Sequence, residues 1–233
     1  MVLKDLKLIE ATEEGWKSIE GFKSIIDDVI KHGDDAAKAL NDLVKAGVSK
    51  EAIEEAVKHG ATVKAVKEGI ERFAKSTSPI KNSHGYTIII ERGNEGYGLI
   101  HGWLRHVHGY EMDYKRETSF FPMGQEIVYY VNGQRKVMKL PKTIQSPEEL
   151  YNEIARLVEQ HKDKLAGDDT VVLHVQSSLP GIDKITLVFK KTGSRQYKLI
   201  TFWPESGSAV LKFEKGGTWY RYDPLTGNIK LWR

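Results

Sequence analysis

Between residues 12 and 75, apolar positions recur every three or four residues, which is the period of an amphipathic α-helix. Glycines interrupt this pattern at intervals, and Gly33 suits the left-handed conformation in which a helix often ends. The pattern therefore predicts a series of short helices. Thr12, Asp34 and Ser49 are the residues expected to cap the first, the second and the third of them.

The pattern changes across residues 75–85, where Ser, Thr, Pro, Asn and Gly are typical of a loop or linker. Beyond this segment, the runs "EIVYYV" and "RKVMKL" flank Asn132 and Gly133, a pair that favours a two-residue hairpin turn. The run "SPEELYNEIARLVEQHK" is typical of a helix, with Ser146 as its cap and Glu149 able to complete a capping box.

Several runs with strand character lie around and after that helix: "YTIIIER", "TVVLHVQ", "KITLVFKK", "QYKLITFW", "AVLKFEK", "TWYRYD" and "NIKLWR". Those after the helix follow one another closely, which predicts an antiparallel meander. The fold class is therefore α+β. We expect a helical N-terminal module of residues 1–78, followed by a domain of residues 79–233 in which helices pack on an antiparallel β-sheet.

The composition is that of a globular protein, with 40% hydrophobic and 29% charged residues among 233. The absence of cysteine excludes disulfides, thiol nucleophiles and cysteine-ligated zinc. Neither a membrane-spanning segment nor a signal peptide is predicted. Residues 1–78 hold 13 basic and 15 acidic side chains, a net charge of −2, and the remainder holds 22 and 17, a net charge of +5. This mildly basic second part is compatible with a nucleic-acid partner.

The segment "GYGLIHGWLRHVHGY", residues 96–110, contains three of the eight histidines. If it is helical, His101, Arg105 and His108 share one face, whereas His106 lies about 140° from His101 around the axis. Imidazole suits general acid–base chemistry near neutral pH. RNA cleavage by transesterification needs a base for the 2′-hydroxyl, an acid for the 5′-oxygen and cations or donors around the phosphate, and His, Arg and hydroxyl groups supply all of these.

Two other interpretations of the histidines remain open. Metal binding has little support, because no HExxH motif is present and no carboxylate stands near the histidine pair at helical spacing, so we expect neither a metal nor another cofactor. Each histidine taken alone is also compatible with a structural, hydrogen-bonded role. His32 and His59 end similar segments, and each is expected to be a last-turn cation rather than half of a paired site.

The segment "GNEGYGLIHGWLRHVHG" resembles the motif "GxGLxHIxxRH" of the barnase–EndoU–colicin–RelE-like ribonuclease superfamily, and above all its phage-borne and bacterial polymorphic or contact-dependent toxin domains. The matching residues are Gly98, Leu99, His101, Leu104, Arg105 and His106. Gly102 departs from the motif, which usually has an apolar residue there. The resemblance continues through "SPEELYNEIARLVEQH" and "KITLVFKKTGSRQYKLITFWPESG", and covers roughly residues 85–215. The stretch between the two helices is longer than expected for the family.

The resemblance implies a metal-independent endoribonuclease toxin domain that leaves a 2′,3′-cyclic phosphate. His101 and His106 would be the acid–base pair, Arg105 would contact the phosphate, and Thr201 would donate a hydrogen bond to it or position a histidine. The implied partners are an RNA, with tRNA as one candidate, and a cognate immunity protein. Such a domain acts in the cytoplasm, in some cases after export within a larger secreted toxin, and its N-terminal part serves delivery, acts as an adaptor or binds the immunity protein.

Substrate-binding candidates lie around these residues. His108 shares the helix face of His101. Lys190, Lys191 and Arg195 are cations beside a predicted strand hairpin, although they also fit a solvated hairpin end.

Tyr220 and Tyr222 alternate along a strand, where they could stack a base or form ordinary cross-strand pairs. His174 also alternates with apolar strand residues, and we expect a structural role for it.

Two rival functions remain. One is a non-catalytic RNA- or protein-binding module, which would bind in a salt-dependent way and yield no product. The other is an ADP-ribosyltransferase toxin. A Glu-x-Glu pair late in a strand would support it, but the segment "FEKGGTWYRY" contains only Glu214.

Overall fold

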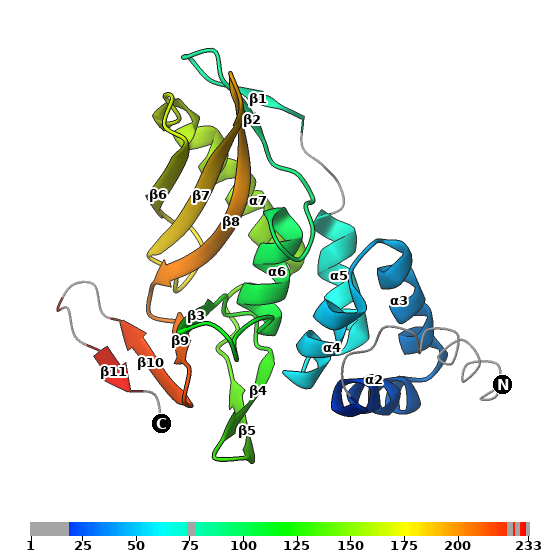
Figure 1. Ribbon diagram of the computed structural model, residues 1–233. Helices are drawn as coiled ribbons and strands as arrows, with labels where there is room; N and C mark the ends of the chain where they lie inside the picture. Colours follow the sequence, from blue (N-terminus) through cyan, green and yellow to red (C-terminus); the bar gives the residue numbers. More distant parts are fainter. Residues whose placement is uncertain (1–18, 74–77, 223–225, 227–228, 232–233) are drawn as a thin grey trace.

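The computed structural model describes residues 19–73, 78–222, 226 and 229–231 (Figure 1). It confirms the α+β class: a group of helices stands on one side, and a sheet with two further helices stands on the other. Thr12, the predicted first cap, lies outside the described residues.

The described residues of the N-terminal part form four short helices, as the apolar periodicity predicted: α2 (Ile19–His32), α3 (Asp34–Lys45), α4 (Lys50–Lys58) and α5 (Val63–Phe73). The cap predicted at Ser49 is present, because its hydroxyl accepts a hydrogen bond from the Ala52 amide over 3.2 Å. The cap predicted at Asp34 is wrong. Gly33, with φ of 65°, occupies that position and Asp34 is already the first helical residue.

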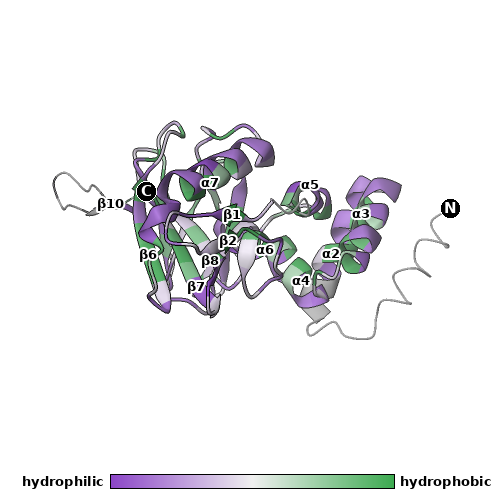
Figure 2. Cartoon of the chain, turned by 90° about the horizontal axis from the view of Figure 1, so that it is seen from above, coloured by the Kyte–Doolittle hydropathy of each residue, from purple (hydrophilic) through white to green (hydrophobic). Residues whose placement is uncertain are grey.

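These helices are not a separate body, because they share one hydrophobic core with the rest of the chain. The Trp103 indole donates a hydrogen bond to the Val66 carbonyl over 3.2 Å. Its ring lies so close to Gly69 that a Cβ there would come within 2.0 Å of it. Figure 2 shows α6 (Gly98–His108) between the strands and the helices α2–α4. The side chains of α6 therefore face two different environments.

The main sheet has the strand order β1-β2-β8-β7-β6. Its strands are β1 (Ile80–Lys81), β2 (Thr87–Ile89), β6 (Thr170–Gln176), β7 (Lys184–Gly193) and β8 (Gln196–Ser206). All neighbours are antiparallel except β2 and β8, which are parallel. The helices α6 and α7 (Pro147–His161) pack on one face, and the other face is open to solvent along β6 (Figure 1).

The later strands form a second sheet, so the prediction of one continuous meander is wrong. Its order is β11-β10-β9-β3, with β3 (Glu117–Phe120), β9 (Leu211–Glu214), β10 (Thr218–Tyr222) and β11 (Ile229–Leu231). The chain leaves the main sheet at Gly207, which has φ of 151° and where a Cβ would lie 2.2 Å from the Gly181 carbonyl oxygen. Only glycine fits this turn.

The hairpin predicted around Asn132 and Gly133 is confirmed as β4 (Glu126–Val131) and β5 (Gln134–Lys139). Both turn residues have positive φ, 51° and 76°, as a type I′ turn requires.

A bulge in β8 determines which side chains reach the open face of the main sheet. Phe189 pairs with Leu199 and Val188 pairs with Thr201, so Ile200 is the extra residue between them. The bulge shifts the alternation by one position. Beyond it, Phe202 is buried on the helix side and Thr201, like Trp203, is on the open side.

Candidate active site

Two glycines of the motif segment, Gly102 and Gly109, occupy positions in or next to α6 that the surrounding structure constrains. The helix ends at Gly109, whose φ of 80° is the left-handed cap and whose amide donates to the Arg105 carbonyl over 3.2 Å. A Cβ on Gly102 would lie 2.3 Å from the Phe202 ring. The departure from the family motif at Gly102 therefore has a local explanation, because Phe202 of β8 occupies the space that an apolar side chain would need.

A pocket of about 270 Å³ opens beside the C-terminal half of α6. This volume is slightly below the size range of small-ligand sites, which begins at about 300 Å³. The lining comes from α6, β3 and β8: Arg105, His106, Glu117, Ser119, Thr201 and Trp203. Three of the four predicted catalytic residues thus meet, although they come from segments about 95 positions apart in the sequence.

His106 is 4% exposed, and its ring stacks on Trp203 with 6.1 Å between ring centroids. Its Nδ1 lies 2.8 Å from the Ser119 carbonyl oxygen. A carbonyl can only accept, so Nδ1 carries the proton and the neutral ring keeps a lone pair on Nε2. Burial lowers the pKa of His106 well below 6.5, and the neighbouring Arg105 charge lowers it further. At neutral pH this imidazole is a base.

Two other lining residues carry polar atoms that the protein leaves unpartnered. Thr201 Oγ1 and Arg105 Nε are both buried without a hydrogen-bond partner among the described residues. The nearest carboxylate to Arg105 is Glu111, whose Oε2 lies 3.8 Å from NH1, beyond hydrogen-bond distance. Buried polar atoms are rarely left unsatisfied in folded proteins, so Thr201 and Arg105 are candidates for binding a ligand with acceptor atoms.

The fourth predicted catalytic residue, His101, does not line this pocket. It lies one helical turn before Arg105, and its Nδ1 donates to the Glu95 carbonyl over 2.6 Å. Burial lowers the pKa of His101. His101 and Arg105 interact through their charges, and a charge on His101 also lowers the pKa of His106, so His101 lies near the pocket without lining it.

His108 is also turned away from the pocket. Its ring contacts Trp103 edge to face at 4.9 Å, and its Nε2 is buried without a partner. Burial lowers the pKa of His108 to about 3. The predicted role of His108 in substrate binding finds no support in this placement, because the side chain belongs to the core.

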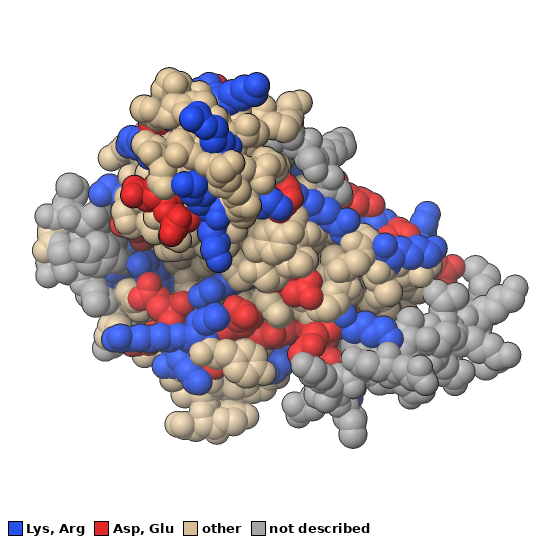
Figure 3. All heavy atoms as spheres, turned by 45° about the horizontal axis from the view of Figure 1, so that its top comes forward, with Lys and Arg blue, Asp and Glu red and all other residues tan. Residues whose placement is uncertain are grey.

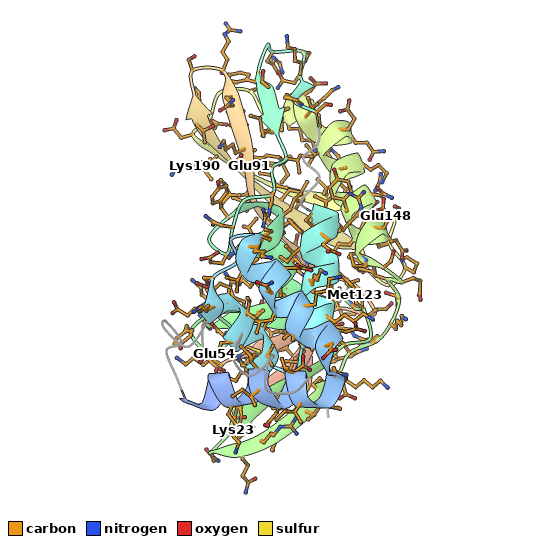
Figure 4. The ribbon with its side chains drawn as sticks, turned by 90° about the vertical axis from the view of Figure 1, so that its right-hand side faces the viewer. Lys23, Glu54, Glu91, Met123, Glu148 and Lys190 are labelled. Carbon is orange, nitrogen blue, oxygen red and sulfur yellow. The ribbon has the colours of Figure 1, made fainter. Side chains whose placement is uncertain are left out.

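Lys190, Lys191 and Arg195 lie at the far end of the β7–β8 hairpin. The hairpin turn precedes Thr201 by five residues of β8, or roughly 17 Å of strand. Figure 4 shows Lys190 at the level of Glu91, well above Met123, which lies just beyond β3. The structure therefore does not bring these cations to the pocket.

Two of these three cations are engaged by nearby carbonyls. Lys191 Nζ donates to the Gly167 carbonyl over 3.2 Å, and Arg195 donates to the His84 carbonyl over 3.4 Å.

The tyrosine pair lies on β10, in the second sheet. Tyr220 is 8% exposed, so its ring offers little surface to a base, whereas the side chain of Tyr222 is outside the described residues. His59, expected to be a last-turn cation, is fully buried, and its Nδ1 donates to the Val128 carbonyl over 2.8 Å. That expectation is wrong, because burial lowers its pKa and favours the neutral ring.

Sequence reasoning missed three lining residues. Glu117 and Ser119 belong to the long stretch between the two family-like helices, and no local pattern marks them. Trp203 carried a weak signal, because it alternates with Thr201 along the strand. The stretch that exceeds the family's expected length thus builds one wall of the pocket.

The surface is of mixed charge. Figure 3 shows Lys and Arg interspersed with Asp and Glu on the face that it presents, not gathered into one basic stripe. Within the described ranges, no group of three His, Asp or Glu side chains is placed to hold a metal ion. None of the helices that the structure describes is long and apolar enough to cross a membrane.

Comparisons of the chain with family models, with curated proteins and with solved structures found no match.

Proposed function

We propose that this protein is a metal-independent endoribonuclease that cleaves RNA by attack of the 2′-hydroxyl on the adjacent phosphodiester. One observation supports the proposal most directly. A buried neutral imidazole, His106, shares a pocket with two polar groups that lack partners, Arg105 Nε and Thr201 Oγ1. A phosphodiester offers acceptors to both groups, and its ribose offers a hydroxyl proton to the imidazole.

Each residue would have a separate role in the reaction. His106 Nε2 accepts the proton of the 2′-hydroxyl, because Nδ1 is already committed to the Ser119 carbonyl. Arg105 and Thr201 donate to phosphate oxygens, whose negative charge grows in the pentavalent transition state. Trp203, stacked on His106, adds an aromatic wall against which the ribose or a base can lie.

The motif resemblance supports the same proposal from the sequence side, since the "GxGLxHIxxRH" pattern supplies both Arg105 and His106. A toxin of the polymorphic or contact-dependent kind, with tRNA as substrate and a cognate immunity protein, is the biological setting that this resemblance implies. The adaptor, delivery or immunity-binding role of the N-terminal helices stays a prediction, and any such role must be compatible with their share in the common core.

The test is incubation of the purified protein with total tRNA, with and without EDTA, on a denaturing gel. We expect discrete fragments in both conditions, each ending in a 2′,3′-cyclic phosphate, and intact tRNA with His106→Ala. Cleavage that EDTA abolishes would contradict the mechanism. Salt-dependent binding with no product at high protein excess would instead favour the non-catalytic RNA-binding module.

A further inference from the structure

The open face of the main sheet carries a histidine that the pocket does not include. The His174 side chain is 56% exposed, and its Nδ1 lies 2.7 Å from Glu205 Oε2. The Thr186 hydroxyl donates to the same carboxylate oxygen over 3.1 Å and is itself fully buried. Three strands thus contribute to one hydrogen-bonded cluster, whereas the alternation in the sequence predicted only a structural role for His174.

The strand register brings this cluster next to the pocket. His174 pairs with Thr186, and Thr186 pairs with Trp203. Side chains opposite one another in a sheet point to the same face, and adjacent strands lie about 4.8 Å apart, so His174 and Trp203 are roughly 10 Å apart between Cα atoms. Trp203 also stacks on His106. Trp203 therefore stands between two imidazoles on one surface.

The two imidazoles are held in opposite ways. His106 is buried, and a neutral carbonyl accepts from its Nδ1. His174 is largely exposed, and a carboxylate accepts from its Nδ1. Because Glu205 engages Nδ1 of His174, Nε2 is the nitrogen of this ring that is left to meet a substrate. A protonated His174 could therefore give a proton from Nε2, whereas His106 keeps a lone pair on Nε2 and can take one.

Transesterification requires both actions, on opposite sides of the phosphate. The lining of the pocket supplies His106 as base, and neither His101 nor His174 is part of that lining. His101 is held on α6 by the Glu95 carbonyl, whereas His174 stands on the open sheet face two strands from Trp203. We infer that His174, oriented by Glu205, is the general acid that protonates the departing 5′-oxygen; this inference rests on the proposed endoribonuclease function. Thr186 is a positioning residue, because it holds the carboxylate and faces no solvent.

The proton and bond balance is complete without a further reactant. The 2′-oxygen forms a bond to phosphorus as its proton passes to His106 Nε2. The bond from phosphorus to the 5′-oxygen breaks as His174 Nε2–H gives its proton to that oxygen. The products are a 2′,3′-cyclic phosphate and a 5′-hydroxyl, and exchange of protons with water resets both rings.

Substrates with different leaving groups separate the acid from the base. A nucleoside 3′-(4-nitrophenyl phosphate) releases nitrophenolate, which is stable as an anion at neutral pH and needs no acid. We expect His174→Ala to cleave RNA at least about 100-fold more slowly than wild type, and to cleave the nitrophenyl esters of the four common nucleosides within threefold of the wild-type rate. Glu205→Gln should lose about tenfold on RNA only. His106→Ala should lose both activities, and His161→Ala, at the end of α7, is the matched control that should lose neither.

Each failure has a distinct signature. Full RNA cleavage by His174→Ala, with an inactive His106→Ala, would overturn the acid assignment and leave the proposed function standing. Equal losses on both substrate types would show that His174 acts through binding or folding, which also overturns it. If the wild-type protein cleaves neither RNA nor any nitrophenyl substrate, the proposed function fails, and the role of His174 fails with it.

Discussion

The two sides of α6 make an instructive comparison, because each buries a histidine and the two are only two residues apart. His106 and His108 are both 4% exposed, and burial lowers the pKa of both. His106 has a carbonyl acceptor on one nitrogen and a pocket beside it. Among the described residues, the His108 Nε2 has no hydrogen-bond partner, the residue does not line the pocket, and Trp103 packs against its ring. Burial and a lowered pKa therefore do not identify a catalytic histidine; a fixed tautomer next to a cavity is the stronger sign.

The difference arises from what packs on each side. The pocket side faces β3 and β8, which bring polar groups with them. The core side faces α5, which brings Gly69 and an apolar surface against Trp103. Substitution of His106 is therefore expected to reduce catalysis, whereas substitution of His108 is expected to affect stability.

The largest expected effect is on catalysis. His106→Ala should lower kcat/KM for RNA about 1,000-fold, equivalent to about 4 kcal/mol of transition-state stabilisation. His108→Phe, which keeps an aromatic ring against Trp103, should stay within threefold of wild type. His101→Ala should lose tenfold or less, because His101 does not line the pocket. The measurement is kcat/KM for each variant, after circular dichroism has shown that the variant is folded. Equal losses of activity at positions 106 and 108 would contradict the difference proposed between the two sides of α6.

The next effect concerns the unpartnered hydroxyl opposite α6. Thr201→Val keeps the side-chain shape and removes the group that would bind phosphate, so kcat/KM should fall about 30-fold, the equivalent of about 2 kcal/mol for a hydrogen bond to a charged group. Thr201→Ser should retain most of the activity. The hydroxyl has no partner in the part of the chain that the structure describes, so the valine variant should unfold at no lower temperature than wild type. Undiminished activity in the valine variant would remove Thr201 from the site.

The last effect is on stability, is of about the same free energy as that of Thr201→Val, and concerns the core side. Burial holds the pKa of His108 at about 3 in the folded protein, against about 6.5 in the unfolded chain. Because the pKa of His108 is lower in the folded state than in the unfolded chain, the contribution of His108 to stability is complete above about pH 6.5 and is lost as the pH falls. Between pH 7.5 and 5 this loss is about 2 kcal/mol. The His108→Phe variant lacks this titrating group. Its free energy of unfolding, measured by urea denaturation, should therefore fall by about 2 kcal/mol less between pH 7.5 and 5 than that of the wild type.

Other groups titrate over the same interval but leave the comparison intact. Burial raises the pKa of Glu55 to about 7, so its contribution has the opposite sign and is lost as the pH rises from about 4.5 to 7. Glu55 is present in both proteins, and its contribution cancels in the difference. Equal acid losses in wild type and His108→Phe would show that His108 is not the group that resists protonation.

The local elements were largely predictable from the sequence, because each depends on neighbouring residues. The hairpin at Asn132 and Gly133 and the cap at Ser49 are examples in which a few adjacent side chains decide the backbone conformation. The helical spacing of Arg105 and His106 could likewise be read from the chain. Asp34 shows the limit of this reasoning, since capping ambiguity at adjacent positions is not resolved by residue type alone.

By itself, then, the sequence determined the α+β class, most element positions and the helix that carries His106. Only the tertiary structure decided that Thr201 reaches the pocket, because the bulge at Ile200 reverses the alternation of β8. Only the tertiary structure joined Ser119 to His106 and Glu205 to His174. These pairings depend on strands that meet from distant parts of the chain, and no local rule of spacing records which of them become neighbours.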